Sequence, residues 1–163
     1  MLQTIACNHP DALEQAIEDL KQALAYRMAG QESQWAQNVA KAIANIQKKL
    51  RQHTATAQAA DGLFSEVDDT RPTLVRQTDE LRREHSNLLG QLLALREEVI
   101  RAKKTMTTSA KASCAEQGSV PQFPNLGAIR QGAEKVLAEL QKNMKAETAL
   151  LMESVNTDIG VGD

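Results

Sequence analysis

The chain has 163 residues, enough for one domain with a hydrophobic core, and carries a formal net charge of −2. Apolar residues make up 42% of it but aromatic residues only 2%, and the apolar share is mainly alanine and leucine. Alanine and leucine are strong helix formers, whereas aromatic and β-branched residues favour strands, so the composition predicts an all-α protein. Basic residues form no stripe and do not alternate with aromatic residues, which argues against a nucleic-acid-binding protein.

The sequence also indicates in which cellular compartment to expect the protein. The N-terminus has no basic region followed by an apolar stretch, and no run reaches the roughly 18 apolar residues that a transmembrane helix needs. Cys7 and Cys114 are far apart and neither belongs to a closely spaced pair, which gives a disulfide or a cysteine-based zinc site little support. We therefore expect a cytoplasmic protein that does not associate with membranes.

The first predicted helix covers residues 10–29. Pro10 suits a first helical turn, and Gly30 is a usual helix terminator. Its apolar residues recur at spacings of three and four, which places them on one face: Leu13, Ile17, Leu20, Leu24 and Met28.

The second predicted helix covers residues 33–60, with Ser33 as its cap and the Asp61-Gly62 pair as its end. Its core-facing stripe consists of Val39, Ile43, Ile46, Leu50, His53 and Ala57. After it, we expect a short turn or helix that covers one end of the core with Leu63, Phe64 and Val67.

The third predicted helix covers residues 71–104 or more, reaching about Glu116 at most, with Thr70 as its cap before Pro72. Its stripe alternates spacings of four and three without a slip: Leu74, Thr78, Leu81, His85, Leu88, Leu92, Leu95 and Val99.

The fourth predicted helix covers residues 125–157 and follows a loop rich in proline and glycine at 118–124, with Asn125 as its cap. Its stripe is Ile129, Ala133, Val136, Leu140, Asn143, Glu147, Leu150 and Ser154, widened by Leu137, Met144 and Leu151. Short connections favour antiparallel neighbours, so we predict a single domain over residues 1–163, an antiparallel up-down-up-down four-helix bundle.

Four polar residues fall on these apolar stripes: His53, His85, Asn143 and Glu147. One interpretation is a buried polar layer that fixes helix register and binds nothing. The other is a single metal ion (iron, zinc or manganese) held by His53, His85 and Glu147, with Asn143 as a supporting group or weak ligand. The chain has three histidines, and His9 precedes the first helix, so a histidine-rich di-iron site is excluded.

Three segments of the sequence, residues 50–64, 81–89 and 150–160, resemble the hemerythrin-like family. Residues 50–64 resemble the end of that family's second helix, residues 81–89 the beginning of its next long helix, and residues 150–160 its last helix. The resemblance implies an up-down-up-down bundle around a carboxylate-bridged di-iron centre, in proteins that bind oxygen, sense oxygen or redox state, or handle iron.

The resemblance also implies that most of the di-iron ligands are missing. His53 and His85 match family ligand positions, and Glu147 stands for a retained carboxylate. No histidine lies among residues 11–29, and the other expected ligands are replaced by Ala57 or Gln58, by Leu89 and by Asn143. These departures imply a degenerate site that does not bind oxygen.

Two functions follow as hypotheses. The first is a non-enzymatic structural or binding module without a cofactor, which acts through a protein partner that the sequence does not name. The second is a residual metal-binding protein with a role in sensing or metal handling. Catalysis has no supporting pattern, because neither cysteine lies near a histidine in sequence and no glycine-rich phosphate loop is present.

Overall fold

A computed structural model describes residues 9–26, 30–112 and 125–156 of the chain. Over these ranges the chain is helical and contains no strand, which confirms the all-α prediction. The elements are α1 (His9–Ala25), α2 (Glu32–Ala57), α3 (Leu63–Thr70), a 3₁₀ turn η1 (Pro72–Leu74), α4 (Val75–Ala112) and α5 (Leu126–Asn156).

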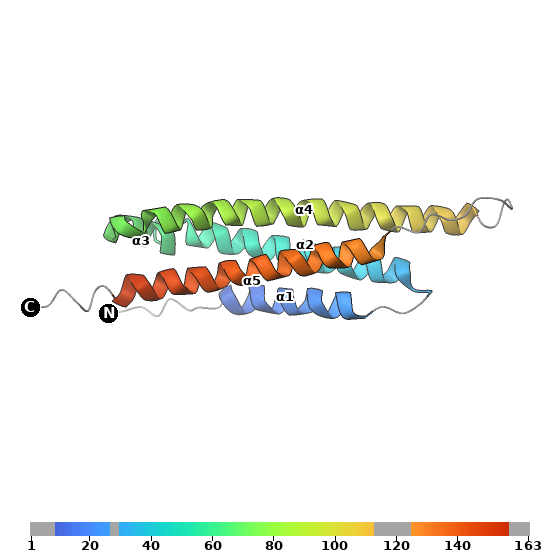
Figure 1. Ribbon diagram of the computed structural model, residues 1–163, viewed down its shortest axis with the longest axis horizontal. Coiled ribbons are helices and arrows are strands. Elements are labelled where there is room, and N and C mark those ends of the chain that lie inside the picture. Colours follow the sequence, from blue (N-terminus) through green and yellow to red (C-terminus); the bar gives the residue numbers. More distant parts are fainter. Residues whose placement is uncertain (1–8, 27–29, 113–124, 157–163) are drawn as a thin grey trace, which may run out of the picture.

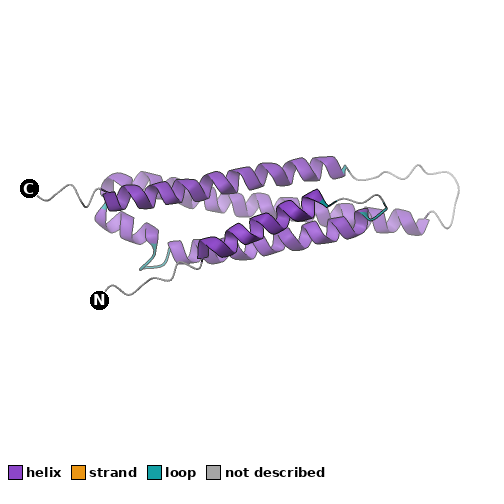
Figure 2. Ribbon diagram, turned by 90° about the horizontal axis from the view of Figure 1, so that it is seen from below, coloured by secondary structure: helices purple, strands orange, loops and turns teal. Residues whose placement is uncertain are grey.

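Four long helices lie lengthwise beside one another, and each runs antiparallel to the one before it in the chain (Figure 1). The short α3 lies at one end, and α4 extends beyond its neighbours at the other end (Figures 1 and 2). Helix α2 packs broadly against α1 and α4, and α4 against α5, whereas α1 and α5 barely touch. This arrangement is compatible with the up-down-up-down order that the sequence predicts. None of the described helices is long and apolar enough to cross a membrane.

Two of the three predicted caps are wrong. Helix α2 begins at Glu32, one residue before Ser33, and the Glu32 side chain accepts a hydrogen bond from the Gly30 amide at 3.1 Å. Thr70 is the last residue of α3 instead of a cap, because Pro72 begins the 3₁₀ turn that leads into α4. The Asn125 cap is confirmed, since its side-chain oxygen accepts a hydrogen bond from the Ala128 amide at 3.0 Å.

Helix α4 continues to Ala112, past the expected minimum at residue 104, and Glu116 lies outside the described residues. In its polar end, three threonine hydroxyls donate to backbone carbonyls four residues earlier: Thr105, Thr107 and Thr108. Helix α1 begins at His9, so the expectation that this histidine precedes the helix is wrong. The helix ends at Ala25, earlier than predicted, and Met28 lies outside the described residues.

The turn after α2 depends on a glycine. Helix α2 ends at Ala57 instead of residue 60, and the chain folds back so tightly that a Cβ on Gly62 would lie 2.3 Å from the Thr56 carbonyl oxygen. Only glycine allows this close approach of two backbone segments. The turn directs α3 back over the end of the bundle.

The buried apolar residues form two clusters. The larger one is built from α1, α2, α4 and α5. The smaller one lies at the α3 end and consists of Ala57, Phe64, Val67, Leu74, Leu81 and Leu150. The predicted cover over one end of the core is therefore confirmed. Leu151, by contrast, does not widen the core, because it is 44% exposed.

A polar layer separates the two clusters along the bundle. On α2, His53 lies between Leu50 of the larger cluster and Ala57 of the smaller one; on α4 and α5, His85 and Glu147 hold the corresponding positions. His85, Asn143 and Glu147 are buried, and His53 is partly buried.

Candidate metal centre

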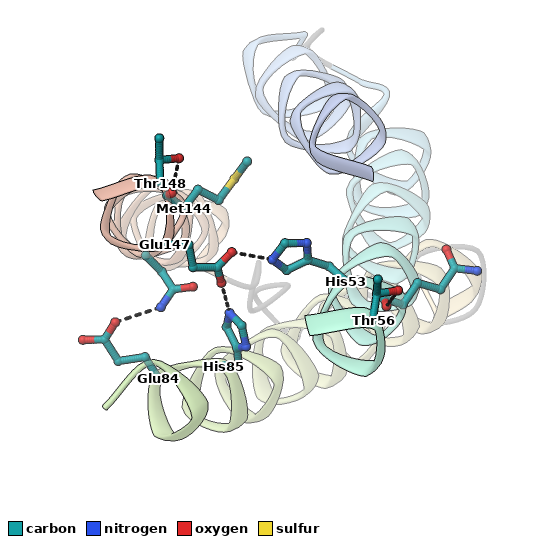
Figure 3. A network of polar contacts seen from close by, with 9 residues as sticks. His53, Thr56, Glu84, His85, Met144, Glu147 and Thr148 are labelled. Carbon is teal, nitrogen blue, oxygen red and sulfur yellow. Dashed lines mark hydrogen bonds and ion pairs between the residues drawn. The ribbon is translucent and has the colours of Figure 1, made fainter. Parts of the chain in front are cut away.

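Three helices bring His53, His85 and Glu147 to one place in the bundle (Figure 3). Their positions follow from the helical repeat, because each continues the apolar stripe of its own helix. One ligand atom from each side chain can be chosen so that all three lie within 4.8 Å of one another. The convergence of the three residues predicted as metal ligands is thus present in the structure.

The Glu147 carboxylate lies between the two imidazoles. His53 Nε2 donates to Glu147 Oε2 at 2.6 Å, and His85 Nε2 donates to Glu147 Oε1. The two rings are nearly perpendicular, with centroids 5.7 Å apart. Because an ionised carboxylate can only accept hydrogen bonds, this hydrogen-bonded arrangement requires a proton on Nε2 of each ring. A metal ion would take the place of those two protons.

Burial and hydrogen bonding act in opposite directions on Glu147. Burial raises the pKa of its carboxyl, but the hydrogen bonds and charges of His53 and His85 outweigh it and hold that pKa to about 2. The hydrogen bond to Glu147 in turn raises the pKa of His53, against the effect of its own burial. The layer therefore holds a carboxylate at neutral pH that a proton on His53, or a cation, can neutralise.

The His85 ring also packs against an aromatic side chain of α3. The Phe64 ring of α3 lies 5.8 Å from the His85 ring, and the Arg82 guanidinium lies 5.3 Å from the Phe64 centroid. Asp68 of α3 pairs with Arg82 at 2.5 Å and accepts the Thr78 hydroxyl at 2.6 Å. Within the described chain, the buried His85 Nδ1 has no hydrogen-bond partner. Apolar contact, and not a second hydrogen bond, therefore orients this ring.

Asn143 is buried but turns to a different partner. Its side-chain Nδ2 donates to Glu84 Oε2 at 2.8 Å, and among the described residues no hydrogen bond links it to the two histidines or to Glu147. Glu84 was not predicted as part of the site, because it lies outside the apolar stripe of its helix. A role for Asn143 as a weak ligand stays a prediction. Cys7 and Cys114 lie outside the described residues.

One side of the site opens to solvent. A groove of about 510 Å³ runs between α1 and α5, with Ile17 and Met144 beside Glu147 and His53. Polar and charged residues complete its lining: Glu14, Glu18, Gln141, Lys145 and Thr148. This groove could not be predicted from the sequence, because a helical repeat does not say which pair of neighbouring helices stays apart.

No family model, curated protein or solved structure matches this chain. The site therefore has to be interpreted from its own donor atoms.

The donors fit one divalent ion. Two imidazole nitrogens and a carboxylate are ligands that zinc, ferrous iron and manganese accept, and three protein ligands leave at least one position open. In a tetrahedral zinc site, ligand atoms lie roughly 3.3 Å apart. The separation of 2.6 Å between His53 Nε2 and Glu147 Oε2 would thus widen by less than about 1 Å.

Proposed function

We propose that this chain is a helical-bundle protein that binds one divalent metal ion, zinc, iron or manganese, through His53, His85 and Glu147, with a role in metal handling or sensing. The observation that carries the proposal is the convergence of two Nε2 atoms on one buried carboxylate, with all three ligand atoms within 4.8 Å. Inward-facing histidines and carboxylates on different helices are how bundles build metal sites.

The open side of the site favours a metal ion over a purely structural layer. A polar layer that fixes helix register needs no route to solvent, yet His53 and Glu147 line a groove. The carboxylate is ionised at neutral pH, because its pKa is held to about 2. A buried anion with one accessible edge offers a position that a hydrated cation can reach and occupy.

The surroundings of His85 support an exchangeable ion. A metal-binding histidine usually donates its other ring N–H to an acceptor, and loss of such a partner typically lowers affinity by roughly 10–100-fold. Among the residues described, His85 Nδ1 has no such acceptor. His85 thus lacks the hydrogen bond that would strengthen it as a ligand, and the site is open to solvent. Both features suit a protein that takes up and releases a metal ion more than one that stores it permanently.

The hemerythrin-like origin of the bundle is part of the proposal. Two features support it. The long helices follow one another in antiparallel order, and His53 on α2 and His85 on α4 both form hydrogen bonds with the carboxylate of Glu147 on α5. Leu89 and Asn143 stand where that family has further histidines, so a second iron would lack ligands. We therefore propose a non-enzymatic protein that does not bind oxygen.

A structural polar layer is the second candidate function. Glu147 already accepts a hydrogen bond from each histidine, and the three residues lie between two apolar clusters. In that case the layer would specify the register of α2, α4 and α5, and the surface would carry any function as a binding module for a protein partner.

Elemental analysis of protein purified without chelator or metal-affinity tag separates the two candidates. We expect up to one metal ion per chain after equilibration with Zn²⁺ or, anaerobically, with Fe²⁺. His53→Gln, His85→Gln and Glu147→Gln should each lose it while circular dichroism stays helical. His9→Gln, which changes the remaining histidine of the sequence, is the matched control and should keep it. Absence of metal in the wild type after both treatments would overturn the proposal in favour of the structural layer.

A further inference from the structure

We propose that the groove between α1 and α5 is the entrance through which a hydrated divalent cation reaches the site, and that Glu14 and Glu18 at its rim attract that cation. The inference rests on the proposed function and adds a route and a charge requirement to it.

Among the described residues, the three predicted ligands differ in how far they are exposed to solvent. The His85 side chain is completely buried, Glu147 is 9% exposed and His53 is 19% exposed. His53 and Glu147 line the groove, whereas His85 does not. An arriving ion therefore meets the His53–Glu147 edge first and the His85 nitrogen last.

Two other surface hollows do not lead to the site. One lies by α4 and the start of α5, near Glu98 and Ile129, and the other lies between α4 and α5, near Glu84 and Glu139. Neither includes His53, His85 or Glu147 in its lining. The α1–α5 groove exists because α1 is held mainly by α2 and makes little contact with α5.

The lining of the groove carries more negative than positive charge. Glu14 and Glu18 lie one turn apart on α1, so their side chains project from the same face. Glu147 adds a third carboxylate at the base, against the single ammonium of Lys145 on α5. Glu18 also pairs with Lys21 at 2.5 Å, so we expect Glu14 to contribute more. A cleft lined by one sign of charge raises the local concentration of the opposite ion and its rate of association.

Polar groups in the groove suit an ion that arrives with its water shell. Gln141 and Thr148 offer oxygen atoms along α5, while Ile17 and Met144 provide apolar wall. Hydrated cations can thus exchange their water for Glu147 and His53 in steps. Anionic ligands would face the three carboxylates and be repelled.

The test is the rate at which the full chain takes up Co²⁺, followed by stopped-flow absorbance at low ionic strength. The double variant Glu14→Gln/Glu18→Gln should bind Co²⁺ roughly 3–10-fold more slowly than wild type, and Lys145→Gln should bind it faster. Both differences should shrink as salt is added. Glu97→Gln/Glu98→Gln changes two exposed carboxylates of α4 outside the groove and should bind at the wild-type rate.

A steric variant tests the route independently of charge. Thr148 is exposed and lines the groove, so Thr148→Phe should narrow it without disturbing the core. Uptake and release of Co²⁺ should both slow, while the equilibrium affinity stays near that of wild type.

The outcomes separate this inference from the proposed function. If wild type binds no Co²⁺ at equilibrium, the metal site itself is overturned. If wild type binds Co²⁺ but the charge and steric variants all take it up at the wild-type rate, the site stands and the entrance is overturned.

Discussion

His53 on α2 donates a hydrogen bond to Glu147 on α5 at 2.6 Å, although 94 residues separate them in the chain. The same carboxylate accepts His85 from α4, 62 residues away. One side chain thus links three of the four long helices at a single level of the bundle. This link can act as part of a metal site and as a structural element, and each role can be tested.

Replacement of the bridging carboxylate should affect binding and stability together. Glu147→Gln removes the anionic ligand and leaves two histidines without a charged acceptor. We expect loss of metal binding and, in the metal-free protein, destabilisation by about 1–3 kcal/mol, the typical effect of an unmet buried hydrogen bond. Urea unfolding and a Co²⁺ titration measure the two effects. Full retention of Co²⁺ by this variant would show that Glu147 is not a ligand.

Phe64 should influence the metal through His85. Phe64→Ala removes the ring that packs against His85 and should destabilise the protein by about 3–5 kcal/mol, as expected for a buried aromatic residue. Because His85 lacks a second hydrogen bond, its orientation should loosen and metal affinity should fall. Ile43→Ala, in the larger cluster, is the control: it should destabilise the fold and leave affinity unchanged. Equal affinities in the two variants would rule out a positioning role for Phe64.

The Asp68–Arg82 pair should make stability depend on acid pH. Burial raises the Asp68 pKa, but hydrogen bonds from Thr78 and Arg82 outweigh it and lower that pKa below its ordinary value of 3.8. A depressed folded-state pKa contributes stability that is present above 3.8 and is lost as pH falls through the folded-state value. Asp68→Asn should therefore be less stable than wild type at pH 7, and this difference should shrink at the most acid pH. Urea unfolding at several pH values measures it; a difference that grows towards acid pH would contradict the assignment.

Two glycines should respond to alanine in opposite directions. In Gly62→Ala the new Cβ would lie 2.3 Å from the Thr56 carbonyl oxygen, so the turn must shift and stability should fall by roughly 1–3 kcal/mol. Gly90 lies exposed inside α4 with nothing within 4 Å of such an atom, so Gly90→Ala should stabilise by about 0.5–1 kcal/mol. Thermal unfolding of both variants gives the comparison. A stable Gly62→Ala variant would mean that the turn has room to relax.

The sequence predicted the helices and three of the site residues because both depend on a helical repeat. The stripe from Leu74 at the end of η1 to Val99 of α4 has no slip, so its phase placed His85 inside without any tertiary information. The same reasoning, applied to the stripes of α2 and α5, predicted that His53 and Glu147 lie on the core-facing side of their helices. What the repeat cannot supply is a pairing that involves a residue off the stripes, such as Glu84 with Asn143 or Asp68 with Arg82.

Two of the helix caps and the groove could not be predicted from the sequence, for different reasons. Ser33 and Thr70 have good capping side chains, but Gly30, Glu32 and Pro72 set the local backbone instead. The groove arises from the distance between α1 and α5, which the packing of α1 on α2 determines. Without knowledge of that packing, Glu14 and Glu18 cannot be distinguished from ordinary charged residues on the exposed face of a helix.

The central claim is tested most directly by calorimetric titration of the metal-free protein with Zn²⁺, with wild type and His85→Gln measured side by side. Binding of one Zn²⁺ per chain to wild type, lost or greatly weakened in the variant while both remain helical, is the result that a site of His53, His85 and Glu147 predicts. No heat of binding with wild type, or equal binding by the variant, would contradict it and leave the three residues as a structural layer.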